Sequence, residues 1–399
     1  MVQYWAAAAM VGAVTFSSAA SAQETRRLDF GAHASVFHDS NVARTDETLA
    51  AQRGIEPEDV IFTPSLRFDL LLPISRQSFF LNGTAGYDFH RENNQLDSER
   101  FNVSSGLNGQ LGPCRGTLMG GYTRAQGDLQ DLTLINPENT REVTSVNANV
   151  SCARPTGLGL QLSAGHEWAN NSNVLQAQSD YESSSGQVGV TYGRPTFGVL
   201  TVFAQRQRTE YDNRIGLGST PGYDMTAAGV SFERRLGARI EGTLSLSYSW
   251  VDPLTSAPGG AGEYTGTTYG ADFVFRPTER LETLFTYERS IVPSTRIGKL
   301  YDIQEDLRLE ARYQLGARFQ VGLGGRMLDS TSEGSTLVGV NPGLLLTDSR
   351  TKVMFGSLTF KQSQRTSIRL DVSREEREAN IPTYEYSTTR VGLTADVAF

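Results

Sequence analysis

The 399-residue chain has little of what thiol, metal or nucleic-acid chemistry requires. It holds 2 cysteines and 4 histidines, and 44 acidic against 36 basic residues give a net charge of −8. Nucleic-acid binding needs concentrated Lys and Arg, so we expect no nucleic-acid partner. The histidines (His33, His38, His90 and His166) are scattered rather than set at metal-ligand spacing, and we expect neither a metal nor a cofactor.

Long apolar runs and catalytic motifs are also missing. After residue 22, no stretch approaches the roughly 18 apolar residues of a membrane-spanning helix. There is no HExxH or GxSxG sequence, and Gly298-Lys299 is not preceded by the first glycine of a P-loop. We therefore expect no enzyme. Glycine is instead abundant, with 40 residues beside 19 Phe and 15 Tyr, a composition that suits many strands joined by tight turns.

The first 22 residues have the features of a secretory signal peptide. An apolar, alanine-rich stretch from Trp5 to Phe16 is followed by Ala20-Ser21-Ala22, a small-residue cleavage site. The residues before the apolar stretch contain no Lys or Arg, which departs from the usual pattern. We expect an exported mature protein that forms a single domain over residues 23–399.

Short segments with apolar side chains at every second position fill the rest of the chain. The last one is the clearest, with Val391, Leu393, Ala395, Val397 and Phe399 at alternate positions. A period of two places these side chains on one face of a β-strand. Such a face either packs on another sheet in a soluble sandwich or meets lipid in a transmembrane barrel.

The connections between these segments favour the barrel, because short and long ones alternate strictly. Eight short turns and nine long polar loops imply eighteen strands in an all-β, transmembrane, antiparallel up-and-down barrel with both termini periplasmic. We therefore expect the protein in the lipid of the bacterial outer membrane. The short turns span 73–77, 112–116, 153–157, 193–198, 235–239, 276–279, 314–318 and 362–366; the long loops span 38–59, 90–100, 125–142, 169–181, 212–222, 251–264, 290–302, 328–350 and 375–384.

Aromatic residues gather at both ends of the expected strands. Two aromatic belts at the level of the lipid headgroups, with an aliphatic band between them, are typical of outer-membrane barrels. Residues next to the long loops are Tyr87, Phe89, Tyr122, Trp168, Trp250 and Tyr287; those next to the short turns are Tyr192, Phe232, Phe275, Tyr313, Phe319, Phe360 and Phe399.

Charged residues of both signs occupy the opposite face of the strands. Facing lipid at mid-depth, each arginine would cost about 2–4 kcal/mol, so we expect these side chains in the lumen. They either form an ion-pair lattice that stiffens the wall or line a path for a polar solute. The candidate lumen residues are Arg67, Asp69, Glu241, Asp272, Glu282, Asp306, Arg308, Glu310, Arg312, Arg326, Arg369 and Asp371.

The two cysteines, Cys114 and Cys152, lie at the start and the end of two strands that we expect to pair. Antiparallel pairing brings them nearly opposite each other at the periplasmic rim, with a Cα separation of about 4.5–5.5 Å. The periplasm is oxidising. We expect a disulfide, and the alternative is two free thiols.

Two long loops have distinctive sequences. The loop 38–59 opens with polar residues after Phe37. The loop 328–350 has apolar halves around Asn341-Pro342-Gly343, which predict a hairpin. This hairpin either prolongs the barrel wall or folds inward as a constriction.

The segment Phe37-His38-Asp39-Ser40-Asn41-Val42-Ala43-Arg44-Thr45 resembles the Tyr-Asp-(Asp/Ser)-Asn-(Val/Ile)-(Tyr/Phe)-Arg-Thr signature of the β-barrel porin 2 family. The sequence departs from it at His38 and Ala43, where the family has aromatic residues. Length and strand number are also similar. The resemblance implies an outer-membrane barrel that accompanies exopolysaccharide biosynthesis, and Phe399 resembles the C-terminal signal for the barrel-assembly machinery.

The sequence leads to three functional hypotheses. The leading one is a porin-like exit conduit for an exopolysaccharide, which implies polysaccharide and a periplasmic export component as partners. The alternatives are a non-conducting structural or adhesive surface barrel and a general diffusion porin for small solutes.

Overall fold

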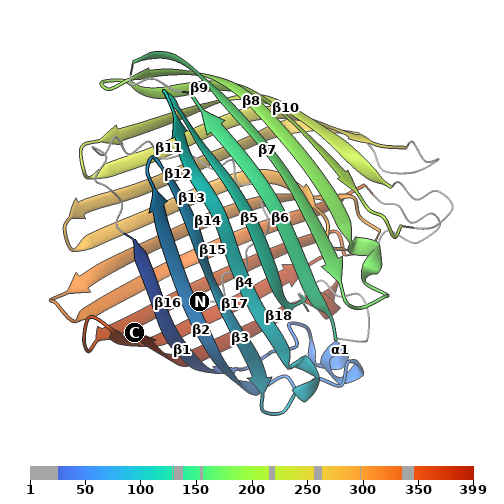
Figure 1. Ribbon diagram of the computed structural model, residues 1–399. Helices are drawn as coiled ribbons and strands as arrows, with labels where there is room; N and C mark the ends of the chain where they lie inside the picture. The colour runs from blue at the N-terminus through green and yellow to red at the C-terminus, as the bar shows by residue number, and fades with distance from the viewer. Residues whose placement is uncertain are drawn as a thin grey trace.

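The computed structural model describes residues 26–127, 129, 138–152, 156–214, 221–255, 263–296, 298–334 and 346–399. They form a closed barrel of 18 antiparallel strands (Figure 1), as the alternating pattern predicted. The strands are β1 (Arg27–Asp39), β2 (Asp59–Ile74), β3 (Gln77–His90), β4 (Ser98–Leu111), β5 (Cys114–Gln126), β6 (Thr140–Ser151), β7 (Gly157–Asn171), β8 (Tyr181–Arg194), β9 (Gly198–Glu210), β10 (Gly222–Leu236), β11 (Ile240–Pro253), β12 (Tyr264–Thr278), β13 (Leu281–Pro293), β14 (Tyr301–Leu315), β15 (Phe319–Glu333), β16 (Asp348–Lys361), β17 (Thr366–Ala379) and β18 (Tyr386–Ala398).

The helical elements that the structure describes lie in the long loops. They include the short helix α1 (Glu47–Gln52) and the 3₁₀ turns η1 (Asn94–Leu96), η3 (Ala177–Ser179) and η5 (Pro382–Tyr384). No helix within the described ranges has the length and apolar character needed to cross a bilayer.

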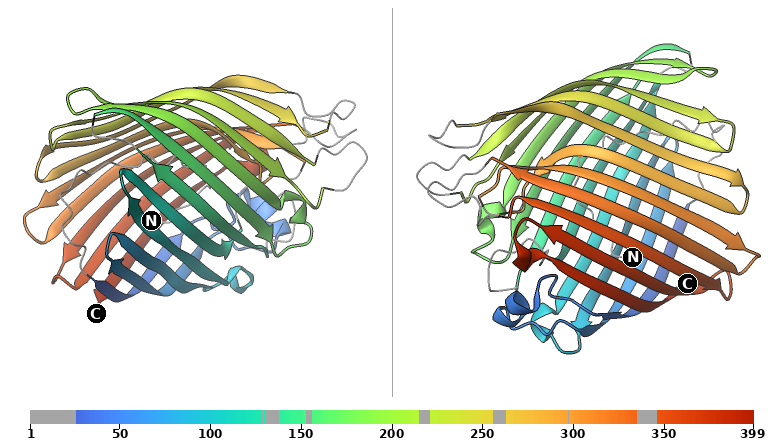
Figure 2. Two further views of the ribbon diagram at one scale, coloured as in Figure 1. Left: turned by 45° about the horizontal axis from the view of Figure 1, so that its top comes forward. Right: turned by 180° about the vertical axis from the view of Figure 1, so that it is seen from behind.

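The barrel closes where the first strand meets the last. Each strand pairs with the next along the chain, and β1 also pairs with β18, from Gly31 opposite Ala398 to Asp39 opposite Arg390. Figure 2 shows the blue first strand beside the red last one. Closure gives every strand a paired neighbour on both sides, so most backbone polar groups of the strands are satisfied within the wall.

The outer face of the wall is apolar and exposed. Leu66, Leu158 and Met354 are 64%, 69% and 73% exposed, and aliphatic side chains occupy alternate positions on nearly every strand. An apolar belt of this extent is stable in lipid and not in water. The chain is therefore a bacterial outer-membrane β-barrel.

The two rims of the barrel differ. One rim carries the tight turns and the C-terminus, and we call it the short-turn rim; the other carries α1 and the longer connections, and we call it the long-loop rim (Figure 1). Outer-membrane barrels place their short turns in the periplasm, and we assign this orientation to the chain.

Several strands extend further toward the long-loop rim than the sequence predicted. The expected loop 290–302 shortens to 294–300, and Glu375 and Glu376, expected in a loop, lie within β17. Cross-strand hydrogen bonding continues beyond the bilayer because it satisfies backbone groups in water as well as in lipid. The predicted signal peptide (1–22) and the turn of the predicted hairpin at Asn341 lie outside the described residues.

The structure contains the expected disulfide between Cys114 and Cys152. Their Cα atoms are 3.9 Å apart, and the bond joins the short-turn ends of β5 and β6. Arg115 pairs with Ser151 next to it, so the two cysteines lie directly opposite each other across the strand pair. The bond closes a 38-residue separation that contains one long loop.

Removing this cross-link should destabilise the barrel, because the unfolded chain gains conformational entropy when it is no longer cross-linked. For a loop of this size we expect a loss of about 3–4 kcal/mol in the free energy of unfolding for the Cys114→Ser/Cys152→Ser variant. Urea unfolding followed by tryptophan fluorescence in detergent measures it. Wild-type protein under reducing conditions is the matched control, and it should lose the same amount; equal stability of all three samples would contradict the expectation.

Candidate functional site

The register places all twelve predicted charged residues on the inward face of the wall, opposite the exposed aliphatic side chains. They lie on β2, β11, β12, β13, β14, β15 and β17. These residues are Arg67, Asp69, Glu241, Asp272, Glu282, Asp306, Arg308, Glu310, Arg312, Arg326, Arg369 and Asp371.

A ladder of ion pairs on β14 and β15 is the most concentrated part of this set. Glu310 is 3% exposed and accepts hydrogen bonds from Arg308 at 2.8 Å and from Arg312 at 2.6 Å. Next to it, Arg326 donates to both oxygens of Asp306 at 2.7–3.0 Å. Two-pronged contacts of this kind fix the orientation of the guanidinium groups.

Other predicted residues form separate pairs along the wall. Distances between the paired atoms are 2.8 Å for Arg369–Asp371, 2.6 Å for Arg27–Asp69, 2.6 Å for Arg235–Glu241 and 2.8 Å for Arg276–Glu282. Arg67 and Asp272 face the lumen outside these pairs. Within the described part of the chain, no three His, Cys, Asp or Glu residues gather as a metal site.

The opposite half of the lumen is polar but uncharged between the rims. On β3–β9 the inward positions at mid-depth carry amides, hydroxyls and glycines besides Met119 and Phe203, as in the bonds from Ser104 to Asn82 at 2.7 Å and from Thr117 to Asn108 at 2.9 Å. Asn147 on β6 points inward and is exposed. The lumen thus has a charged half and a neutral half.

Aromatic side chains fill part of the lumen at the long-loop rim. We define the mouth cluster as Tyr181, Tyr211, Tyr223, Val251, Leu300 and Tyr301, all at most 3% exposed. Ring centroids lie 5.5 Å apart for Tyr223–Tyr301 and 6.0 Å apart for Tyr181–Tyr211. Burial raises the pKa of Tyr211 to about 12, and its hydroxyl donates to the carbonyl of Leu300 at 2.5 Å.

The mouth cluster joins strands that are far apart around the wall. Pairing between β12 and β13 stops at Tyr269 and Arg289, and beyond this point the β13–β14 end leaves the wall. Tyr301 then packs against Tyr223 and Val251, which lie on the inward face of β10 and β11. The end of β13–β14 therefore lies inside the barrel and narrows the mouth.

The segment that resembles the family signature forms a clasp across the β1–β18 seam. Buried Asp39 accepts hydrogen bonds from Arg44 at 2.8 and 3.1 Å and from Thr388 at 2.7 Å. Thr45 donates to the carbonyl of Thr383, in the last long loop, at 2.5 Å. These contacts tie the first long loop to the last one at the point where the barrel closes.

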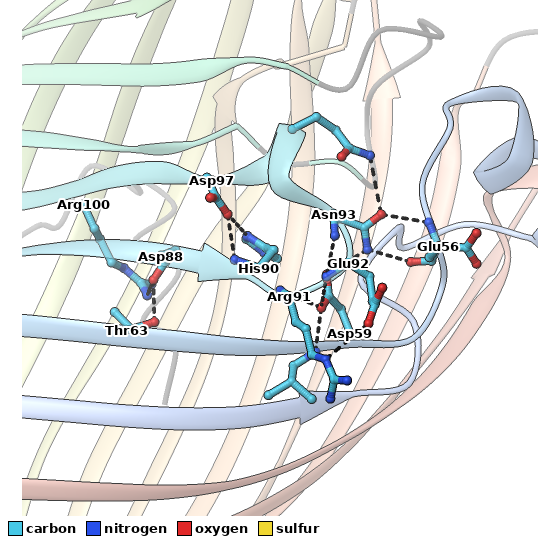
Figure 3. A network of polar contacts seen from close by, with 12 residues as sticks. Glu56, Asp59, Thr63, Asp88, His90, Arg91, Glu92, Asn93, Asp97 and Arg100 are labelled. Carbon is cyan, nitrogen blue, oxygen red and sulfur yellow. Dashed lines mark hydrogen bonds and ion pairs between the residues drawn. The ribbon is translucent and has the colours of Figure 1, made fainter.

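A second polar knot holds the first two long loops together (Figure 3). Asp59 is 2% exposed and accepts the backbone amides of Val60, Arg91, Glu92 and Asn93 at 2.7–3.1 Å. The Asn93 side chain also donates to Asp59, at 2.8 Å. The carboxylate thus satisfies the backbone amides of the turn, and it shares the amide of Arg91 with the carbonyl of Val60.

The mouth cluster was not predicted from the sequence. A signal for it exists, because tyrosine is the first residue of several strands that descend from the long-loop rim. Tyr181, Tyr264, Tyr301 and Tyr386 begin β8, β12, β14 and β18, and Tyr223 is the second residue of β10. All of them except Tyr301 occupy inward positions of their strands, and a repeated inward aromatic at strand starts indicates a packed mouth rather than a lipid belt.

A closed barrel with a polar lumen and a lipid-facing exterior defines the class of the protein: an outer-membrane barrel of porin-like construction. No family model matches the chain, and no curated protein matches it. The similarity to the β-barrel porin 2 family therefore stays a resemblance.

Solved structures that match along most of the chain include proteins of Pseudomonas. OccK2 (OpdF) of Pseudomonas aeruginosa has a TM-score of 0.48 at 12% identity, covering 93% of this chain and 98% of that one. The OpdK protein of the same organism has 0.47 at 11% identity, covering 94% and 99%. A BenF-like porin from Pseudomonas fluorescens Pf-5 has 0.48 at 11% identity, covering 94% and 99%. We take the architecture from the strand pairings of the chain itself.

Replacing Asp59 tests the knot between the first two loops. In Asp59→Asn, an amide group faces backbone N–H donors, and we expect a loss of about 1–3 kcal/mol in the free energy of unfolding. Faster trypsin cleavage after Arg91 should accompany it. Glu58→Gln is the matched control, because the Glu58 side chain is exposed and pairs with His38; identical behaviour of both variants would contradict the role assigned to Asp59.

Proposed function

We propose that the protein is a narrow outer-membrane channel for small polar solutes. The observation that carries this proposal is a polar, two-sided lumen whose long-loop mouth is narrowed from one side by the packed mouth cluster. Polar walls support a water-filled path, and a narrowed mouth limits the size of what passes. We keep the expectation that the protein is not an enzyme.

The lumen offers a small solute two kinds of contact. Half-exposed guanidinium groups of Arg308, Arg312 and Arg326 line one side, each held by a carboxylate. Amides such as Asn147 line the other. A solute that carries hydroxyl or charged groups can replace its hydrating water by successive contacts with these side chains. None of the side chains encloses a deep binding pocket.

Export of an exopolysaccharide, the function implied by the family resemblance, is not supported by any comparison. A polymer chain that threads the barrel also needs a mouth free of packed side chains. The barrel-assembly machinery and a periplasmic export component stay predictions from the sequence.

Measurements of bilayer conductance and of proteoliposome swelling test this proposal. Refolded protein in a planar bilayer should give small stable conductance steps, and proteoliposomes should swell at rates that fall steeply from monosaccharide to trisaccharide. Large steps that added polysaccharide blocks would overturn the proposal in favour of polymer export. A folded barrel that gives no steps would overturn it in favour of a structural or adhesive role.

Truncating Tyr301 should widen the mouth. Tyr301→Ala removes a buried ring, at a cost of about 3–5 kcal/mol in the packing of the mouth cluster, and leaves the lumen below unchanged. We expect larger conductance and a higher size limit in the swelling assay. Tyr248→Ala removes a tyrosine from the lipid-facing side and is the control; equal conductance of the two variants would argue against the mouth cluster as the constriction.

Neutralising Glu310 should shift the ion selectivity toward anions. Glu310→Gln leaves Arg308 and Arg312 without their shared carboxylate, so the lumen gains about one positive charge. Breaking this buried pair also costs about 3–5 kcal/mol. Reversal potentials in a salt gradient measure the shift. Glu376→Gln makes the same change of charge at a carboxylate paired with Arg374 on the outer face, and its reversal potential should stay at the wild-type value.

A further inference from the structure

Two arginines lie on the lipid-facing side of the wall at the short-turn rim. On β8 the exposed Tyr192 faces outward, and Arg194 follows two residues later on the same face, at the end of the strand. On β10 the exposed Val230 faces outward, and Phe232 and Arg234 follow it at alternate positions. The strand register confirms this face, because Tyr192 and Phe232 both lie beside the same residue of β9 between them.

Charge is otherwise missing from this part of the outer face. Among the strand residues that the structure describes, every other outward position in the short-turn half of the wall carries an uncharged residue. Those on the neighbouring strands β9 and β11 are Gly198, Leu200, Val202, Ile240, Gly242 and Leu244. An arginine on the lipid face costs about 2–4 kcal/mol at mid-depth and little near the interface, so its place at the rim is the place where lipid tolerates it.

The two arginines lie at the level of the lipid headgroups. Tyr192 and Phe232 belong to the aromatic side chains next to the short turns, and such aromatic belts mark the membrane–water interface. Each arginine follows its aromatic neighbour by two residues, which is about 6–7 Å along the strand. The flexible arginine side chain bridges this distance along the wall, with its stem on apolar surface and its guanidinium group among the headgroups.

Both arginines flank the same turn. Gly198, at the start of β9, pairs with Arg194 on β8. On its other side, Gly198 lies against the backbone carbonyl of Glu233, the residue before Arg234. The guanidinium group of Arg234 donates to the carbonyl of Thr196 in the β8–β9 turn at 3.4 Å, so it leans toward Arg194. Because the residue between the two cations has no side chain, the wall is bare there.

The chain does not neutralise these two charges. Both side chains are exposed, and neither forms an ion pair with any residue that the structure describes. The carboxylates of the adjoining hairpin, Glu233 and Glu241, lie on the inward face, where Glu241 pairs with Arg235. An outward arginine at the long-loop rim behaves differently, because Arg206 pairs with Asp224 at 3.0 Å. Unpaired cations on the outer face indicate an anionic partner outside the chain.

Apolar surface adjoins the two cations on the side toward mid-depth. Phe197, in the turn, is exposed and lies beside Phe232, with ring centroids 5.2 Å apart. Above it, the outward residues of β9 are Leu200 and Val202, and Val202 is 55% exposed. The order of cationic groups at the rim followed by apolar surface matches a phospholipid, with its phosphate at the surface and its acyl chains below. A soluble anion would use only the first of these two parts.

We propose that Arg194 and Arg234 bind the phosphate group of an anionic phospholipid in the periplasmic leaflet of the outer membrane, with its acyl chains against the outward face of β9. The planar fork of arginine matches the geometry of a phosphate group. The site prefers phosphatidylglycerol to phosphatidylethanolamine, because this face offers the two cations and no carboxylate to pair with the ammonium group of phosphatidylethanolamine. This role is independent of what passes through the lumen.

The experiment compares the lipids that the full-length barrel retains. Protein reconstituted in equal parts of phosphatidylglycerol and phosphatidylethanolamine is extracted into mild detergent, and bound lipids are counted by native mass spectrometry. The test variant is Arg194→Gln/Arg234→Gln. The matched control, Arg239→Gln/Arg280→Gln, removes two cations from the same rim; these directly precede the lipid-facing Ile240 and Leu281 and so lie on the lumen side of the alternation. The heat-dependent gel mobility of each variant verifies a folded barrel.

Wild type and control should retain phosphatidylglycerol in excess, and the test variant should lose about fivefold of this preference for each arginine removed. Equal retention of both lipids by wild type, or an unchanged preference in the test variant, would overturn the proposal. An equal loss in the control would overturn it in favour of a general effect of net charge. Sedimentation with isolated peptidoglycan that only the test variant loses, without any lipid preference in wild type, would overturn it in favour of a cell-wall contact.

Discussion

The whole molecule depends on the requirement that backbone amides and carbonyls in hydrocarbon find partners within the protein. Pairing of β1 with β18 meets it by closing the sheet on itself. Once the ring is closed, every strand has one face toward lipid and one toward the lumen. The seam is therefore the place where extra reinforcement is most useful, and the Asp39–Arg44 clasp lies there.

The strand number and the facing of most side chains followed from the sequence because both depend on a local period of two. Arg308 and Glu310 could be assigned to the inward face from their spacing alone. The position of the β13–β14 end in the mouth could not be predicted, because Ile291 and Tyr301 occupy the alternate positions that face lipid elsewhere on these strands. The bend of β13–β14 turns that face onto the inside of β10 and β11. Long-range packing of this kind leaves no trace in a period of two.

The residues that resemble the family signature serve architecture rather than transport. Asp39 bonds to Arg44, Thr45 bonds to the last long loop, and none of the three belongs to the charged ladder of the lumen. A motif with this role indicates how the barrel closes. It carries no information on whether the solute is a polymer or a small molecule.

The pairing between β12 and β13 ends at Tyr269 and Arg289, although β12 continues to Tyr264. Beyond this point, side chains rather than a backbone ladder hold the end of β13–β14 on its β12 side, whereas its ladder with β15 continues as far as Tyr301 opposite Glu333. Side-chain contacts can rearrange without breaking the cross-strand hydrogen bonds of a sheet. The wall thus has an edge without backbone pairing between β12 and β13 at the long-loop rim. Movement of the β13–β14 end away from the lumen would widen the mouth, while the strand pairing nearer the short-turn rim stays intact.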